Sequence, residues 1–151
     1  MKALEDSKTV ELNKLIEERF KQEQSEWGEK ITTLIKQTGD TSKLAECQVI
    51  QLSYRQQLQE KLVEHRMTLD KRYEVYDKQK VQRFREYTTH YDIKLSSSEK
   101  TAFIDADCSA IKRQIRMFER EIQFLEECVK TLDNLGFAIK NKIEIVSQQL
   151  M

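Results

Sequence analysis

The chain has 151 residues and balances 26 basic against 26 acidic side chains, so any basic surface must be local. It contains no proline and three glycines, where average usage would give about seven and about ten. This composition excludes a fold rich in turns and strands and predicts an all-α protein. With 34% charged and 38% hydrophobic residues, the helices should be amphipathic with narrow inner faces, a thin core and a need for self-association.

The sequence gives no sign of export or of a membrane segment. Its longest apolar runs are three residues, at 102–104 and 137–139, whereas a spanning helix needs about 20. The cysteines Cys47, Cys108 and Cys128 form no CxxC pair and leave an odd thiol. We therefore expect a cytoplasmic protein whose cysteines pack in the core.

Three short stretches rich in Gly, Ser, Thr, Asp or Asn break the chain, at 38–42, 96–98 and 134–136. They separate four expected helices, at about 9–37, 42–93, 97–134 and 137–149. We expect three regions: an N-terminal amphipathic helix (1–40), a long helical hairpin (41–134) and a C-terminal oligomerisation helix (135–151). The first helix should pack alongside the hairpin.

The second expected helix has an eleven-residue repeat, which favours a nearly straight or slightly right-handed helix. Its apolar stripe is aliphatic at first and then becomes aromatic, with one lysine in it. From residue 62 the stripe consists of Leu62, His65, Leu69, Tyr73, Tyr76, Lys80, Phe84, Tyr87 and Tyr91.

Residues 43–94 are the only distinctly basic segment, with 11 basic and 8 acidic side chains. On a helix, Lys71, Lys78 and Arg85 share one face at spacings of seven, while Lys80 and Arg83 lie nearer the aromatic stripe. Two interpretations remain open. The cluster can be a solvated charged face beside a packed aromatic seam, which composition alone favours. It can also be a surface where cations bind phosphates and aromatic rings stack on unpaired bases.

The third expected helix has the clearest pattern. Ser96 and Glu99 form a capping box at its start, and Gly136 is expected to end it as a left-handed cap residue. Its apolar positions step 4-3-4-3 as a heptad seam, which predicts left-handed coiled-coil packing. The seam consists of Ile104, Cys108, Ile111, Ile115, Phe118, Ile122, Leu125, Val129 and Leu132.

Catalysis and metal binding receive no support from the sequence. The two histidines, His65 and His90, lie 25 positions apart on one expected helix, about 37 Å by its rise, so they cannot meet within one chain. Neither belongs to a metal-binding pattern, and His65 is expected to be a packed core residue. No P-loop or nucleophile motif occurs. We therefore expect a protein that is not an enzyme and uses no cofactor.

Three short motifs resemble the UvsY family of recombination mediators from T-even-like bacteriophages. Residues 135–140 read LGFAIK, where the family carries GFAIK after its long helix, and residues 41–44 read TSKL beside the family's STKL. Residues 81–87 read VQRFREY beside the family's KARLDYY, which aligns Arg83, Phe84 and Tyr87. The chain departs from this last motif where valine replaces the lysine and glutamate replaces the first tyrosine.

The resemblance implies a small helical protein that assembles into a ring of six or seven subunits. It implies partners too: single-stranded DNA, a phage single-strand-binding protein that the ring loosens from DNA, and a phage RecA-like recombinase that it loads, all in the cytoplasm of the infected host. The candidate DNA-binding residues are Lys71, Lys78, Lys80, Arg83, Phe84, Arg85 and Tyr87. The candidate oligomerisation residues are Gly136, Phe137, Ile139, Ile143, Val146 and Leu150. The alternative is a helical coiled-coil adaptor or scaffold without nucleic-acid binding.

Overall fold

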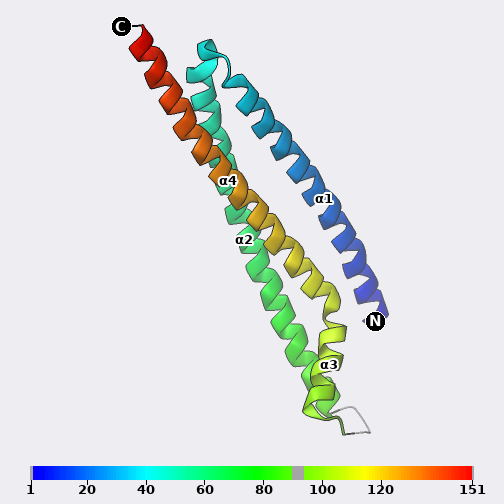
Figure 1. The fold of residues 1–151 in the computed structure, drawn as a ribbon. Coiled ribbons are helices and arrows are strands. Elements are labelled where there is room, and N and C mark those ends of the chain that lie inside the picture. Colours follow the sequence, from blue (N-terminus) through cyan, green and yellow to red (C-terminus); the bar gives the residue numbers. More distant parts are fainter. Residues whose placement is uncertain (1, 90–93, 151) are drawn as a thin grey trace. The chain divides into compact units, whose positions relative to one another are not determined.

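The computed structural model describes residues 2–89 and 94–150, and side chains from residue 7 onward within them. In these ranges every regular element is a helix, which confirms the all-α prediction (Figure 1). The elements are α1 (Lys2–Gln37), the 3₁₀ turn η1 (Thr41–Lys43), α2 (Leu44–Thr89), α3 (Ser97–Asp107) and α4 (Ser109–Gln149). No described helix combines the length and apolarity needed to cross a membrane.

The chain divides into two compact units. Unit 1 comprises residues 1–18 and 66–120, and unit 2 comprises residues 19–65 and 121–151. The helices α1, α2 and α4 each contribute a segment to both units, because each point where the units divide lies within one of these helices.

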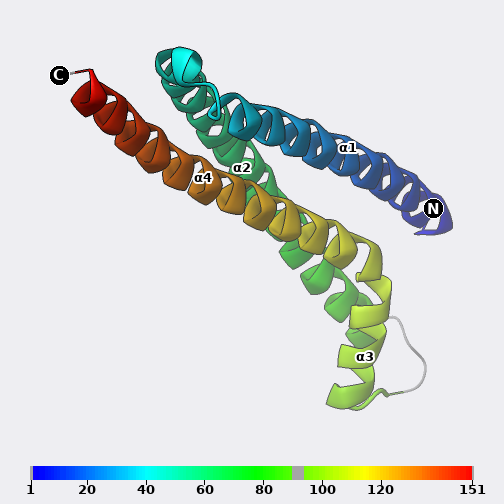
Figure 2. The same ribbon diagram turned by 45° about the horizontal axis from the view of Figure 1, so that its top comes forward.

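In unit 1, α3 lies against the C-terminal part of α2 (Figures 1 and 2). Its core consists of Tyr87, Ile104, Cys108, Ile111 and Ile115. Two hydrogen bonds show the order of the contacts. Tyr87, late in α2, donates to Asp107 at the end of α3, and Tyr73, earlier in α2, donates to Glu119 further along the chain on α4. Pairs in this order are those of an antiparallel hairpin, as the sequence predicts for this unit.

In unit 2, segments of α1, α2 and α4 lie alongside one another (Figure 2). Gln51 donates to the Leu132 carbonyl at 2.9 Å, and Arg55 pairs with Asp133 at 2.6 Å, which ties α2 to α4. The two helices run in opposite directions (Figure 1). The apolar core of this unit is formed by Phe20, Trp27, Ile31, Leu34, Leu44, Cys47, Leu58, Leu62, Ile122, Leu125, Cys128, Val129, Leu132 and Ile139.

All nine residues of the expected heptad seam are buried, from Ile104 to Leu132. The capping box is also confirmed, because the Glu99 backbone N–H donates to the Ser96 hydroxyl and that hydroxyl donates to the Glu99 carboxylate at 3.0 Å. The outer helix bounds differ from expectation. The first helix starts at Lys2 rather than near residue 9, and the second is described as far as Thr89, so the expected stretch to residue 93 lies outside the described residues.

The expected single helix 97–134 is wrong, because it is interrupted at Cys108. This residue has φ −96° and ψ 8°, outside the helical region, and it separates α3 from α4. The break leaves the heptad spacing intact, since Cys108 itself is buried at its seam position. Apolar periodicity could not reveal it, because the pattern continues through the break without a change of step.

The expected helix end at Gly136 is wrong as well, since α4 runs without interruption to Gln149. None of the described glycines has a positive φ, so Gly136 is no left-handed cap. A Cβ at this position would lie 2.9 Å from Nε2 and 3.2 Å from Cδ of Gln51, whose side chain is buried. The glycine therefore lets α2 and α4 approach closely around the Gln51 amide.

This close approach predicts that Gly136→Ala destabilises the protein by about 1 kcal/mol, although alanine is the better helix former. The added methyl group displaces Gln51 and breaks its buried bond to Leu132. In a Gln51→Ala background the same change should instead stabilise the protein by up to about 1 kcal/mol, because the space is then free. Urea unfolding of the two single variants and the double variant measures this coupling; an effect of Gly136→Ala that is independent of residue 51 would contradict it.

Candidate nucleic-acid interface

The C-terminal half of α2 carries the basic face expected from the sequence. Lys71, Lys78 and Arg85 are exposed, and among the residues that the structure describes none of them pairs with an acidic side chain. They follow one another at seven-residue spacing on a continuous helix, so the face extends for about 21 Å. Lys78 and Arg85 border a shallow surface hollow of about 440 Å³. Exposed cations without internal partners are the groups that can bind phosphates.

A second groove, of about 490 Å³, lies between α2 and α3. Lys80 and Phe84 line it from α2, and Thr101 and Asp105 line it from α3. The Phe84 side chain is 52% exposed, although the Lys100 ammonium lies 5.5 Å from its ring centroid. Among the described rings of the predicted aromatic stripe, Phe84 is the most exposed, and it lies beside two lysines, an arrangement suited to stacking on a base.

Two of the candidate DNA-binding residues, Arg83 and Tyr87, instead pack within unit 1. The Arg83 side chain is 17% exposed and its Nη1 lies 3.0 Å from a Glu86 carboxylate oxygen. Tyr87 is buried, donates its hydroxyl to Asp107 and stacks on Phe103 with ring centroids 5.6 Å apart. Whether either residue contacts DNA stays a prediction; in the structure their visible role is packing.

The structure thus separates the cluster into an outward basic face, a groove-lining pair and two packed residues. The stripe residue Tyr91, like His90, lies outside the described residues. Lys100 was missed by the sequence reasoning because it belongs to α3, and only the packing of α3 on α2 brings it to Phe84. Its sole signal in the sequence is its position in the first turn after the capping box.

The candidate oligomerisation residues also differ in exposure. Phe137 is 69% exposed and Leu150 is 84% exposed, while Ile143 and Val146 are half-buried. Ile139 is completely buried within unit 2, where it belongs to the apolar core. Gly136 faces Gln51 of the same chain. Any contact between subunits through α4 would therefore use its outward residues.

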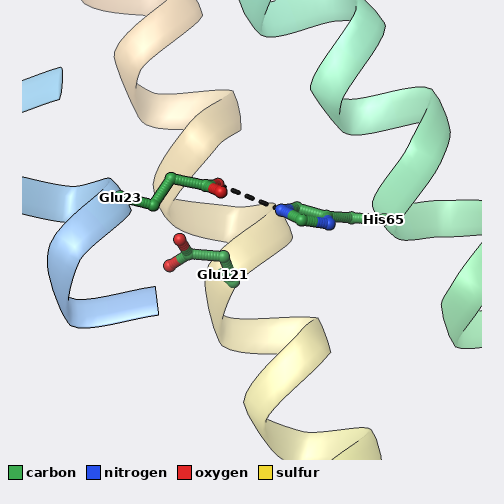
Figure 3. Close-up of side chains that lie close together, drawn as sticks. All are labelled: Glu23, His65 and Glu121. Carbon is green, nitrogen blue, oxygen red and sulfur yellow. Dashed lines mark hydrogen bonds and ion pairs between the residues drawn. The ribbon is translucent and has the colours of Figure 1, made fainter. Parts of the chain in front are cut away.

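A buried polar cluster lies elsewhere in unit 2, where α1, α2 and α4 contribute Glu23, His65 and Glu121 (Figure 3). The His65 Nε2 atom lies 3.0 Å from a Glu23 carboxylate oxygen, and the Phe20 ring meets the imidazole edge-on at 5.3 Å. Gln24 donates from Nε2 to the Glu121 Oε1 atom at 2.7 Å. All three members of the cluster are at most 8% exposed.

The two carboxyl groups of this cluster have opposite electrostatic surroundings. Burial raises the pKa of Glu121 to about 7; the hydrogen bond from Gln24 opposes this shift and the negative charge of Glu23 adds to it. Burial also acts to raise the pKa of Glu23, but the hydrogen bond and charge of His65 outweigh it and hold that pKa below its ordinary value. The sequence indicated His65 as a core histidine but gave no sign of its partners, which come from two other helices.

Comparison with known families gives one match. Residues 42–149 match the family described as "Recombination, repair and ssDNA binding protein UvsY". The matched range contains α2, α3 and α4 and therefore the basic face, and it leaves out α1. No match was found to a curated protein or to a solved structure.

The surroundings of Glu121 predict a pH-dependent stability. Its folded pKa of about 7 exceeds its ordinary value of 4.5, so the folded chain holds a proton that the unfolded chain releases. This contribution to the free energy of unfolding is complete below about pH 4.5 and is lost as the pH rises to about 7. Glu121→Gln, which cannot ionise, should thus match the parent protein at pH 5 and be more stable at pH 8, by roughly 1–3 kcal/mol.

Urea unfolding at both pH values, with a chelator present, measures this difference. Glu127→Gln is the matched control, because Glu127 is an exposed glutamate on the same helix. Its effect should be the same at pH 5 and pH 8. A difference between Glu121→Gln and the parent that does not change with pH would contradict the assigned shift.

Proposed function

The chain belongs to the UvsY family of recombination, repair and single-stranded-DNA-binding proteins, and from this premise we propose that it is a recombination mediator. It binds single-stranded DNA as a homo-oligomer, loosens a single-strand-binding protein from the DNA and promotes loading of a RecA-like recombinase. It acts as a phage protein in the cytoplasm of an infected bacterium, and its partners are this single-strand-binding protein and this recombinase.

The observation that carries the proposal is the outward basic face of α2. Lys71, Lys78 and Arg85 are exposed cations without an acidic partner among the described residues, and they lie inside the range matched by the family. Neutralising phosphates releases counterions, which supplies affinity independent of base sequence. A mediator needs this independence, because it must act wherever a single strand is exposed.

Phe84 and Lys80 extend this surface toward α3. An exposed aromatic ring can stack on any base, a contact worth about 1–3 kcal/mol per base. Lys80 lines the same groove and its ammonium lies 5.6 Å from the Tyr76 ring centroid. We place the phosphate contacts on the Lys71–Lys78–Arg85 face and the base contact at Phe84. Arg83 and Tyr87 support this surface from inside unit 1.

One chain offers few cations, so a single subunit would bind weakly. In an assembly of six or seven subunits the same face is repeated, and linked sites raise the overall affinity far above that of one site. Such binding falls steeply with salt, because many counterions are released together. The outward residues of α4, Phe137 and Ile145, which are 69% and 54% exposed, support self-association through this helix.

Replacing two cations of the basic face tests the DNA-binding site. In Lys78→Gln with Arg85→Gln we expect at least tenfold weaker binding to a labelled oligothymidine in fluorescence anisotropy. The slope of log K against log salt concentration should become shallower by about 1.4 for each subunit in contact with DNA, since each phosphate contact contributes about 0.7. Helicity and oligomer mass should not change, because both side chains are exposed.

The matched control is Lys36→Gln with Lys140→Gln, which removes the same charge from exposed positions in unit 2. Its binding should stay within about twofold of the parent, because phosphate contacts are local. Equal losses in both double variants would show a general charge effect and refute the proposed face. A parent protein that is oligomeric but does not bind at low salt would favour the adaptor or scaffold alternative.

Self-association is tested by Phe137→Ser with Ile145→Ser. These changes remove exposed apolar surface from α4 without touching the core, so we expect a smaller mass in sedimentation with unchanged helicity. DNA affinity should fall too, because the linked sites are lost. Substitution is preferable to truncation before Gly136, since truncation also deletes Ile139 from the core of unit 2.

The control is Val49→Ser with Leu52→Ser, which removes comparable exposed side chains from α2 in the same unit. We expect it to retain the parent mass. An unchanged mass for the α4 variant would contradict the proposed contact.

A further inference from the structure

The buried cluster of Glu23, His65 and Glu121 is not used by the proposed function. The three side chains come from three helices of unit 2, and one ligand atom from each can be chosen so that all lie within 4.8 Å of one another. Figure 3 shows the Glu23 carboxylate directed at the His65 imidazole, with the Glu121 side chain beside that of Glu23. A metal ion that accepts an electron pair from each of the three would lie in the core of this unit.

One acceptor in the cluster lacks a partner. The Glu121 side chain is 1% exposed, and its Oε1 atom accepts the bond from Gln24, but its Oε2 atom has no hydrogen-bond partner. An unpaired buried oxygen of a carboxylate is costly, because it has lost its water and gained nothing in return. Once the carboxyl group is ionised, this atom is an electron-pair donor without a partner, beside the imidazole and the second carboxylate of unit 2.

The charges of the cluster point in the same direction. If both were ionised, Glu23 and Glu121 would place two negative charges in a site that is almost closed to water, and burial accordingly raises the pKa of Glu121. Lys61 is the cation acting on Glu23, but its ammonium pairs with Glu64 near the surface. A divalent cation bound between the three side chains would balance both negative charges and satisfy the unpaired oxygen.

The set of donor atoms selects the kind of ion. One imidazole nitrogen with two carboxylate oxygens suits Zn²⁺ and related first-row ions, whereas Mg²⁺ and Ca²⁺ prefer oxygen atoms only. Ligand atoms around tetrahedral Zn²⁺ stand about 3.4 Å apart. The His65–Glu23 pair, at 3.0 Å, is near that spacing, and the Glu121 ligand atom lies within 4.8 Å of the other two.

Two neighbouring residues complete the arrangement. Gln24 holds the Glu121 carboxylate through its second oxygen, as residues around a metal commonly orient its ligands. Cys128 lies one heptad beyond Glu121, but burial and the charge of Glu121 raise the pKa of its thiol to about 11. A protonated thiol is a poor ligand, so the site is one of nitrogen and oxygen donors.

We propose that Glu23, His65 and Glu121 bind one divalent transition-metal ion, with Zn²⁺ as the best fit, and that this ion fastens α1 to α2 and α4 within unit 2. Glu23 belongs to α1, outside the range matched by the family, while the other two ligands lie inside it. The metal is structural, and it makes the placement of α1 in this unit dependent on the ion.

Thermal unfolding of the full chain tests the site in the absence of DNA. The protein is stripped with a chelator, dialysed and titrated with Zn²⁺, Co²⁺ or Mg²⁺. Calorimetry should give one Zn²⁺ per chain. At a free concentration about one hundred times the dissociation constant, the unfolding midpoint should rise by roughly 5–10 °C. Co²⁺ should produce visible absorption bands without the near-ultraviolet band of a thiolate ligand, and Mg²⁺ should have no effect.

Glu121→Gln is the informative variant, because it keeps the shape of the side chain and an oxygen that can accept from Gln24. It should fold, and it should lose the Zn²⁺-dependent shift and the Co²⁺ bands. His65→Gln should lose both as well. The controls are Glu127→Gln, an exposed glutamate of α4, and His90→Gln, the other histidine of the chain; both should retain the full response.

Three results would overturn the proposal: no midpoint shift with Zn²⁺ or Co²⁺, an equal shift in Glu121→Gln, or an equal response to Mg²⁺. The first would leave the cluster as a purely hydrogen-bonded core network. Because none of these measurements involves DNA, failure of the metal site is distinguishable from failure of the mediator function.

Discussion

Burial of the apolar seam of α3 and α4 is the constraint on which the rest of the structure depends. A helix with apolar residues at every third or fourth position must cover that strip, and each covered leucine or isoleucine contributes about 1.5–3 kcal/mol. In unit 1 the seam is covered through Ile111 and Ile115, and in unit 2 through Leu125 and Leu132. The antiparallel pairing of α2 with this strip fixes which of its own residues can face outward.

The same constraint explains why the basic cluster divides. The face with Lys78 and Arg85 points away from the seam and stays free for a charged ligand. Tyr87 and Arg83 lie on the covered side, where the hydroxyl meets Asp107 and the guanidinium meets Glu86. A cluster that looks uniform along the sequence therefore has an outward cationic face and an inner part packed within unit 1, where Tyr87 contacts α3.

The polar residues inside the core add specificity to a seam that apolar packing alone would leave free to slide. In unit 1 the Asn13 amide donates to the Ala110 carbonyl and accepts from Gln114. In unit 2 the Gln51 amide fits only because residue 136 lacks a side chain. A buried polar group without a hydrogen-bond partner is costly. Each of these groups therefore favours the one register of the helices that provides its partner.

The sequence by itself determined the helical class, the seam of α3 and α4, the capping box at Ser96 and the location of the basic segment. These features depend on local periodicity and on residues three or four positions apart, which one helix fixes. Only the tertiary structure decided the break at Cys108, the role of Gly136 and the meeting of His65 with carboxylates from two other helices. Each of these depends on which side chains a neighbouring helix brings close, and no spacing along a single segment contains that information.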